Sequence, residues 1–218
     1  TGEADTGRAD TGADTGAQAD KLSYSQIDAL AAQASPGAGG LLWAPWLAGE
    51  RSPFTDANAR GTLVGASHAT GRAELSRAVM EGVAHSVRAL LERVLTEAHP
   101  TELLVCGGVT KSAVWMQVLA DVLGIPLTVA PDAENAGARG AALLAGQRSG
   151  LGWFDSLNPP GFAPRGRSFL PTADGPTRRL LERQHALHLK LHATLRETFR
   201  GLAEAEAEYS IERAREKV

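Results

Sequence analysis

Apolar residues recur every three or four positions in two long segments, which is the spacing of one face of a helix. The segment 72–97 carries Leu75, Val79, Val83, Val87, Leu90, Leu91 and Val94, and His99-Pro100 follows it. The second segment carries Leu180, Leu181, Leu187, Leu191, Leu195, Phe199 and Leu202. We therefore predict one long amphipathic helix over 72–97, ended by the proline, and another that begins near Thr177.

Short apolar runs elsewhere in the chain predict strands. They lie at 41–47, 61–65, 103–106 and 127–130, and Pro45 interrupts the first. Three more helices are predicted: from a Ser23 or Ser25 cap to Gln33, over 111–123 with Gly124 as a left-handed cap, and over 134–150. Residues 49–60 and 151–171 are predicted to be loops. The alternation of strand and helix predicts an α/β fold with neighbouring parallel strands.

The two ends of the chain differ from the rest in composition. The first 20 residues repeat TGEAD, TGRAD and TGAD and contain no Leu, Ile, Val, Phe, Tyr or Trp. Such a segment cannot bury enough apolar surface to offset its ordering entropy, so 1–21 is predicted to be a disordered tail. We expect one folded unit over 22–203, and a charged tail over 204–218 that is frayed or solvent-exposed because it has few apolar anchors.

The overall composition excludes several classes of protein. The net charge is −3, which gives no electrostatic basis for binding nucleic acid or an anionic membrane surface. No apolar run approaches the roughly 20 residues that a membrane helix needs, and the sequence shows no apolar signal segment. A single cysteine, Cys106, excludes an internal disulfide framework and is expected to be an inert core thiol. A cytoplasmic location is predicted.

The pair Gly107-Gly108 stands between a predicted strand and a predicted helix. A glycine-rich turn before a helix leaves first-turn amides unpaired at the positive end of the helix dipole, and such a site suits a phosphate. Ser112 could add a hydroxyl from the first helical turn. The alternative is that the glycines only let strand and helix pack closely. The stretch ENAGARGAALLAG, 134–146, poses the same choice between close packing and a planar ligand such as adenine.

Other candidate residues have simpler interpretations. Glu50 and Arg51 are expected to fix their own loop rather than to touch a substrate. His188 and His192 have the i,i+4 spacing that can bind a metal, but without an acidic or cysteine neighbour they are expected to lie on a solvated face. No metal site is therefore predicted. The tryptophans at 43, 46 and 115 are expected to be core or lobe-contact residues.

Three blocks of sequence together resemble a known family. They are PWLAGERSPFTDANARGTLVG with the following RAELSRAVMEG, then LLVCGGVTKSAVWMQVLADVLGIPLTV, then ENAGARGAALLAG. In order and spacing, from about Tyr24 to Gly150, they resemble the C-terminal half of FGGY carbohydrate kinases, with xylulokinase-like members as the closest fit. The resemblance implies a ribonuclease-H-like lobe of the actin/hexokinase type, in which a mixed sheet is flanked by helices.

The resemblance also implies a nucleotide site. In this family ATP, with Mg2+ bound through the nucleotide, lies in the cleft between two such lobes. Carried over by position, the residues that face the nucleotide are Gly107, Gly108 and Ser112, with Val109 at the third glycine position. Val109 departs from the usual glycine or alanine there, and its β-branch is expected to narrow the turn and weaken nucleotide binding. Ala66 stands where the family prefers a larger aliphatic residue.

The family's catalytic aspartate precedes the matched region, so no catalytic residue is predicted in this chain. The chain is expected to be the nucleotide-side lobe of an enzyme that phosphorylates a ketose or polyol such as xylulose, and to be inactive alone because phosphoryl transfer needs both sides of the ATP. The alternatives are a non-catalytic nucleotide-binding or interaction module and a degenerate fragment. The expected partners are a nucleotide, a sugar only when an N-terminal lobe is present, and a complementary lobe or a second copy of the chain.

Overall fold

The computed structural model describes residues 21–96, 100–131, 133–148, 166–172 and 174–215. Segment 1–20 of the predicted tail and most of the predicted loop 151–171 lie outside these ranges. Five α-helices are described: α1 (Tyr24–Gln33), α2 (Arg72–Val94), α3 (Ala113–Leu123), α4 (Ala136–Arg148) and α5 (Gly175–Arg215). The strands are β1 (Leu42–Ala44), β2 (Thr62–Val64), β3 (Leu103–Val105), β4 (Leu127–Val129) and β5 (Ser168–Phe169). Short 3-10 turns lie at Ala38–Gly40 (η1), Gly108–Lys111 (η2) and Ala133–Asn135 (η3).

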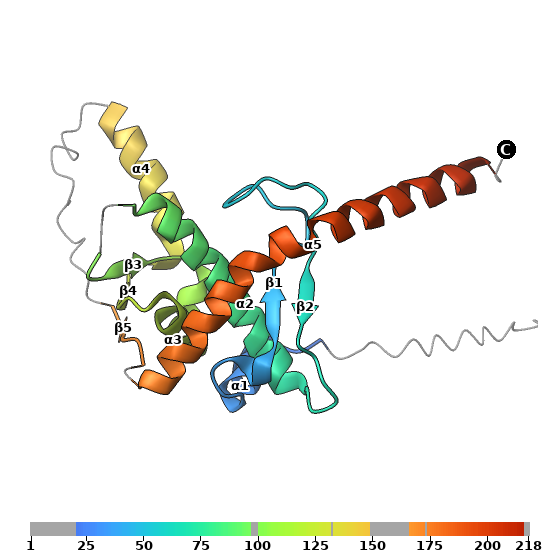
Figure 1. Ribbon diagram of the computed structural model, residues 1–218. Helices are drawn as coiled ribbons and strands as arrows, with labels where there is room; N and C mark the ends of the chain where they lie inside the picture. The colour runs from blue at the N-terminus through green and yellow to red at the C-terminus, as the bar shows by residue number, and fades with distance from the viewer. Residues whose placement is uncertain (1–20, 97–99, 132, 149–165, 173, 216–218) are drawn as a thin grey trace, which may run out of the picture.

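The strands form two separate sheets (Figure 1). β1 and β2 pair antiparallel, with Leu42 opposite Val64. The second sheet has the order β3-β4-β5, in which β3 and β4 are parallel and β4 and β5 antiparallel. The predicted α/β architecture with a mixed sheet and helices is confirmed, as is the parallel pair. The prediction of loop throughout 151–171 is wrong at 168–169. These residues form β5 by pairing with β4, which precedes α4 in the sequence.

The predicted helix boundaries depend on local capping, and one start and one end are confirmed. Ser23, not Ser25, caps α1: its side chain accepts a hydrogen bond from the Gln26 amide while the Gln26 side chain reaches back to the Ser23 amide. Gly124 ends α3 in the left-handed conformation with a φ of 66°. Such ends are fixed by residues within one helical turn, so a local pattern is enough to find them.

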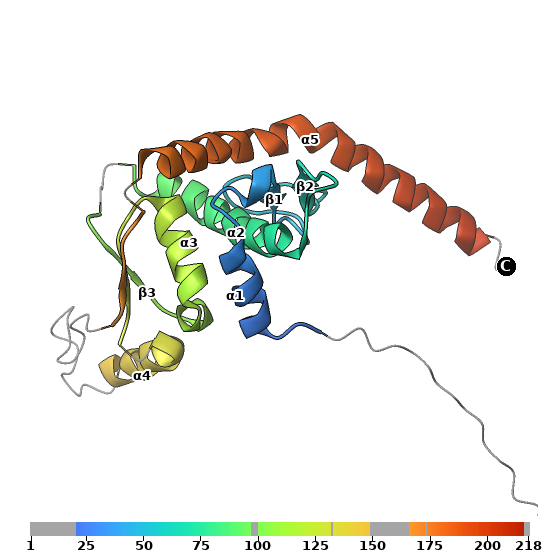
Figure 2. The same cartoon turned by 90° about the horizontal axis from the view of Figure 1, so that it is seen from below.

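Helix α2 is the central element, but its buried face differs from its apolar stripe. It packs against α1, α3, β1 and α5 (Figure 2). Its buried residues are Arg77, Ala78, Met80, Glu81, Gly82, Ala84, His85 and Ala89. Leu75 and Val79 of the stripe are 40% and 45% exposed, and Val94 is 75% exposed. The helix itself is confirmed, ending three residues earlier than predicted, but the apolar stripe is not what anchors it to the described lobe.

Small residues let α2 approach its neighbours closely. A Cβ built on Gly82 would lie 2.2 Å from the carbonyl oxygen of Trp43 in β1, so any larger residue would push helix and strand apart.

The main core cluster lies between α2 and α3. It comprises Ala31, Met80, Ala84, Met116, Val118, Leu119, Ala120, Val122, Leu127 and Leu181.

A buried ion pair fixes α2 to the chain that follows α1. Glu81 is 3% exposed, and its Oε1 accepts hydrogen bonds from Arg77 Nε at 2.7 Å and from the Gly37 amide at 2.9 Å. Arg77 also donates to the carbonyl oxygen of Ala34 at 3.3 Å. Burial raises the pKa of Glu81, and the adjacent guanidinium opposes that rise. The pair gives each buried charge a counter-charge and satisfies the Gly37 amide, while Glu81 Oε2 has no hydrogen-bond partner among the described residues.

Helix α5 crosses the lobe and then projects beyond it (Figures 1 and 2). Leu181 enters the main core, and Phe199 packs with Trp46, which is 2% exposed and so belongs to the core as predicted. The charged segment after Ala203 continues as helix to Arg215, and its side chains are exposed. The expectation that His188 and His192 lie on a solvated face is wrong: His188 is 3% exposed, and His192 Nε2 lies 2.9 Å from Asp56 Oδ2.

Replacing Glu81 with alanine should destabilise the lobe by about 3–5 kcal/mol, because Arg77 would remain buried without its counter-charge and the Gly37 amide without its acceptor. Urea unfolding monitored by circular dichroism measures the loss. The matched control is Glu197→Ala, since Glu197 is 73% exposed and, among the described residues, pairs only with Arg200 on the same helix face. That change should cost less than about 1 kcal/mol. Equal costs for the two variants would contradict the role assigned to the buried pair.

Candidate functional site

The turn after β3 has a backbone shape that requires glycine at its first position. Gly107 has a φ of 93°, and its amide donates to the carbonyl oxygen of Ala133 at 2.8 Å. The Gly107 carbonyl oxygen accepts both from the Thr110 amide, at 3.2 Å, and from Thr110 Oγ1, at 2.7 Å. These bonds close the η2 turn and attach it to η3, the turn that leads into α4.

Ser112 caps the helix that follows. Its Oγ accepts a hydrogen bond from the Trp115 amide at 3.0 Å, so α3 begins at Ala113 rather than at Lys111 as predicted. The hydroxyl hydrogen is not used in this bond and can be donated to another acceptor. Within the described ranges the amides of Gly108 and Val109 have no hydrogen-bond acceptor, as is usual for the first residues of a helical turn. The turn therefore offers free donors next to a helix N-terminus.

The packing explanation for the glycine pair is wrong. A Cβ built on Gly107 or on Gly108 would meet no atom of the described residues within 4 Å. The conformation explains Gly107, but neither conformation nor contact within the described lobe explains Gly108. The same holds in α4, where a Cβ on Gly137 or Gly140 would also meet no described atom within 4 Å. Within the part of the chain that the structure describes, both glycine-rich stretches therefore border open space.

Val109 turns its side chain toward the protein. It is partly buried and packs against the main core cluster between α2 and α3. This contact accounts for an apolar, β-branched residue at the third position of the turn. The contact also places the bulk of the side chain against the core and away from the free Gly108 side of the turn.

Three residues beside the turn were not predicted as site residues. Lys111 Nζ lies 2.8 Å from Glu134 Oε2, and Arg167 Nη2 donates to the carbonyl oxygen of Thr110 at 2.8 Å. Together they border a pocket of about 400 Å³ lined by Thr110, Lys111, Val129, Ala130, Ala133, Glu134, Asn135 and Arg167. None of the four predicted residues, Gly107, Gly108, Val109 and Ser112, lines this pocket. Lys111 was visible inside the glycine motif, but Arg167 is brought in by β5 from 57 positions away.

The remaining candidates have structural or unremarkable surroundings. Glu50 Oε1 accepts from the Arg51 amide at 2.8 Å and the Ser52 amide at 3.3 Å, which agrees with a role in fixing its own loop. The expectation that Cys106 is a core thiol is wrong, because β3 ends at Val105 and Cys106 is exposed. Over the described ranges no group of three or more His, Cys, Asp and Glu side chains could hold a metal ion. No helix there is both long and apolar enough to cross a membrane.

Comparison with known proteins places this geometry in a family context. Residues 6–148 match the FGGY family of carbohydrate kinases, C-terminal domain. This match begins inside the segment that is predicted to be a disordered tail. A xylulose kinase of Staphylococcus epidermidis is 37% identical over 136 residues, which cover 62% of this chain and 27% of that protein. A glycerol kinase of Polaromonas naphthalenivorans is 38% identical over 154 residues, covering 67% and 30%.

The fold agrees with the sequence match. The ligand-bound crystal structure of xylulose kinase from Lactobacillus acidophilus superposes with a TM-score of 0.70 at 24% identity, over 82% of this chain and 36% of that one. The predicted actin/hexokinase-type ATPase fold is thereby confirmed. The chain spans less than a third of the length of the curated relatives it matches. It belongs to the FGGY family of carbohydrate kinases, of which it represents the C-terminal domain.

Proposed function

We propose that the chain is the nucleotide-side lobe of a sugar or polyol kinase, and that the turn 107–112 binds the phosphates of ATP. The observation that carries this proposal is Gly108. Its Cβ position borders open space, its amide has no acceptor among the described residues, and nothing in the described lobe needs a glycine there. A phosphate group that approaches the backbone explains all three features, because it accepts from the amides and excludes a side chain.

The charges around the turn support the same occupant. The N-terminus of α3 directs its positive dipole end at this region, and the free hydrogen of the Ser112 hydroxyl can be donated to a phosphate oxygen. Lys111 and Arg167 bring two cations to the neighbouring pocket, and Glu134 partly offsets them. Mg2+ would arrive with the nucleotide and be held by its phosphates, since no protein metal cluster is found in the described ranges.

The open face of α4 is the proposed position for the base. Gly137 and Gly140 lie one turn apart on this helix, and both border open space. Glycine inside a helix costs up to about 1 kcal/mol relative to alanine, so an occupant that lies flat against the bare backbone would offset that cost. Adenine is planar and fits such a face. The bond between Gly107 and Ala133 then fixes the separation of the phosphate turn and the start of α4.

For the intact protein of which this lobe would be part, the proposed reaction is ATP plus D-xylulose to ADP plus D-xylulose 5-phosphate. The resemblance to xylulose kinases supports this substrate, and the match to a glycerol kinase makes glycerol the competing one. The chain contributes nucleotide binding and no catalytic base. We infer a cytoplasmic location for such an enzyme.

A complementary lobe is the second proposed partner, because the N-terminal part of the apolar stripe of α2 is exposed. Leu75 and Val79, four residues apart on α2, are 40% and 45% exposed. Large apolar side chains exposed on one face of a helix are typical of an interaction surface. A non-catalytic binding module, or a self-associating fragment, would use the same surface.

The Gly108→Ala variant should bind Mg-ADP at least about tenfold more weakly than the unmodified chain, equivalent to about 1.4 kcal/mol, because its methyl group occupies the space assigned to a phosphate. Its stability should be unchanged within about 0.5 kcal/mol, since the methyl meets no protein atom within 4 Å. Isothermal titration calorimetry measures the affinity and thermal unfolding the stability. Gly201→Ala, an exposed position on α5 that also borders open space, is the matched control and should bind Mg-ADP normally.

The chain alone should show no xylulose- or glycerol-dependent ATP hydrolysis, because one lobe supplies neither the catalytic base nor the sugar contacts. A coupled assay for ADP release tests this expectation. Sugar-dependent turnover would contradict the lobe assignment. Adding an N-terminal lobe of a related kinase should restore turnover if the apolar stripe of α2 is a lobe contact.

A further inference from the structure

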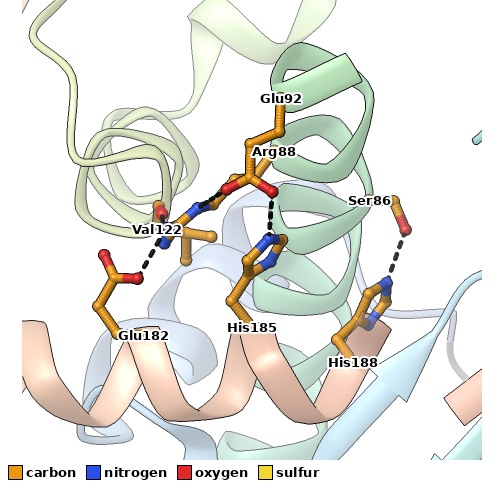
Figure 3. Close-up of polar contacts among 7 residues, drawn as sticks. All are labelled: Ser86, Arg88, Glu92, Val122, Glu182, His185 and His188. Carbon is orange, nitrogen blue, oxygen red and sulfur yellow. Dashed lines mark hydrogen bonds and ion pairs between the residues drawn. The ribbon is translucent and has the colours of Figure 1, made fainter. Parts of the chain in front are cut away.

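Three histidine rings are buried together where α5 crosses α2. His85 comes from α2, and His185 and His188 come from α5; they are 0%, 4% and 3% exposed. The His85 ring centroid lies 5.5 Å from that of His185 and 5.6 Å from that of His188. Figure 3 shows the two α5 histidines pointing from α5 toward α2. We call His85, His185 and His188 the histidine cluster.

His185 and His188 differ in their polar surroundings. His185 Nε2 lies 3.0 Å from Glu92 Oε2, within a network in which Arg88 contacts Glu92, Glu182 and the Val122 carbonyl oxygen (Figure 3). Among the described residues the polar neighbours of His188 are neutral: its Nε2 lies 3.3 Å from Ser86 Oγ, its ring lies 5.9 Å from that of Trp46, and the Trp43 backbone is nearby. One turn further along α5, His192 pairs with Asp56 outside the cluster.

Of the three rings, His85 has the fewest neighbours that could stabilise a protonated, positively charged imidazole. Neither of its ring nitrogens has a hydrogen-bond partner among the described residues, and its charged neighbour is the Arg88 cation. A proton on His85 would create a buried charge without a counter-ion, next to two further imidazoles. A proton on His188 would meet the same problem, because no carboxylate among the described residues contacts it. The packing of α5 against α2 thus requires that these two rings stay neutral.

We propose that the histidine cluster is an acid-sensitive latch, which holds α5 against α2 while its imidazoles are neutral and releases α5 when they are protonated. The latch contributes to docking together with apolar anchors at its two ends, Leu181 in the main core and Phe199 beside Trp46. Protonation weakens the middle of this contact. The released α5 would free the surface of α2 that it covers.

The direction of the pH dependence follows from burial. Burial lowers the pKa of His85 to about 3 and that of His188 to about 4, and it lowers the pKa of His185 despite Glu92. A released histidine titrates near 6.5. The released state therefore binds more protons than the docked state below this value, so docking is strongest above about pH 6.5 and weakens as the pH falls toward the docked values. For each of His85 and His188, which have no carboxylate partner among the described residues, the ratio of released to docked α5 rises by roughly 20-fold between pH 7 and pH 5.

Hydrogen exchange measured on the full chain at pH 7 and pH 5 tests the latch. Protection factors, referenced to intrinsic rates at each pH, should fall at least about tenfold over α5 residues 180–192, while those of α3 stay within about threefold. In His85→Phe/His188→Gln the α5 response should fall to less than about threefold, because phenylalanine keeps the buried ring and glutamine can keep the contact with Ser86.

Two further variants keep the test decisive. The single variant His188→Gln should remove about half of the logarithmic response, even if the double variant does not fold. His68→Gln, at an exposed loop position, should respond as the unmodified chain does. The proposal is overturned if α3 and α5 lose protection together, since that is global acid unfolding, or if the histidine variants keep the full response of α5.

Discussion

The lobe depends on a requirement that the buried face of α2 imposes: each charged group on that face must find a partner on a neighbouring element. Five polar residues follow one another along α2 at helical spacing: Arg77, Glu81, His85, Arg88 and Glu92. The first three are buried. Glu81 accepts a hydrogen bond from the Gly37 amide. Arg88 donates hydrogen bonds to Val122 on α3 and to Glu182 on α5. These contacts are directional, so they fix the angles at which the other helices meet α2. Small residues such as Ala78, Gly82 and Ala84 let those elements come close enough to make them.

The same rigid frame positions the proposed nucleotide turn. α3 is packed along α2, and its N-terminus carries the η2 turn with it. The Gly107–Ala133 hydrogen bond then ties the turn to the start of α4. A phosphate site made of backbone amides needs such support. If the turn were mobile, the entropy lost on ordering it would offset the free energy gained from the hydrogen bonds to the phosphate. Val109 is part of this support, since its side chain joins the core.

The sequence predicts local features well and long-range partners poorly. The start of α1 after Ser23 or Ser25, the Gly124 cap, the parallel pair of β3 and β4 and the fold class all follow from spacing, turn residues or motif order. The buried face of α2 does not, because none of the stripe residues is fully buried and Leu75, Val79 and Val94 are exposed. Arg167 and β5 reach the site only through pairing with β4, and His188 is buried by a helix crossing that no local pattern encodes. Close packing, the alternative role for Gly108, could be excluded only from the contacts in the structure and not from the sequence.

The central claim is that free amides of the turn bind nucleotide phosphates, and amide nuclear magnetic resonance tests it residue by residue. In a proton–nitrogen spectrum of the labelled chain, Mg-ADP should shift the Gly108 and Val109 amides strongly. Adenosine at the same concentration should leave these two resonances nearly unchanged, because it lacks the phosphates. If saturating Mg-ADP leaves the two resonances in place, or if adenosine moves them equally, the turn is not a phosphate site and the proposal is contradicted.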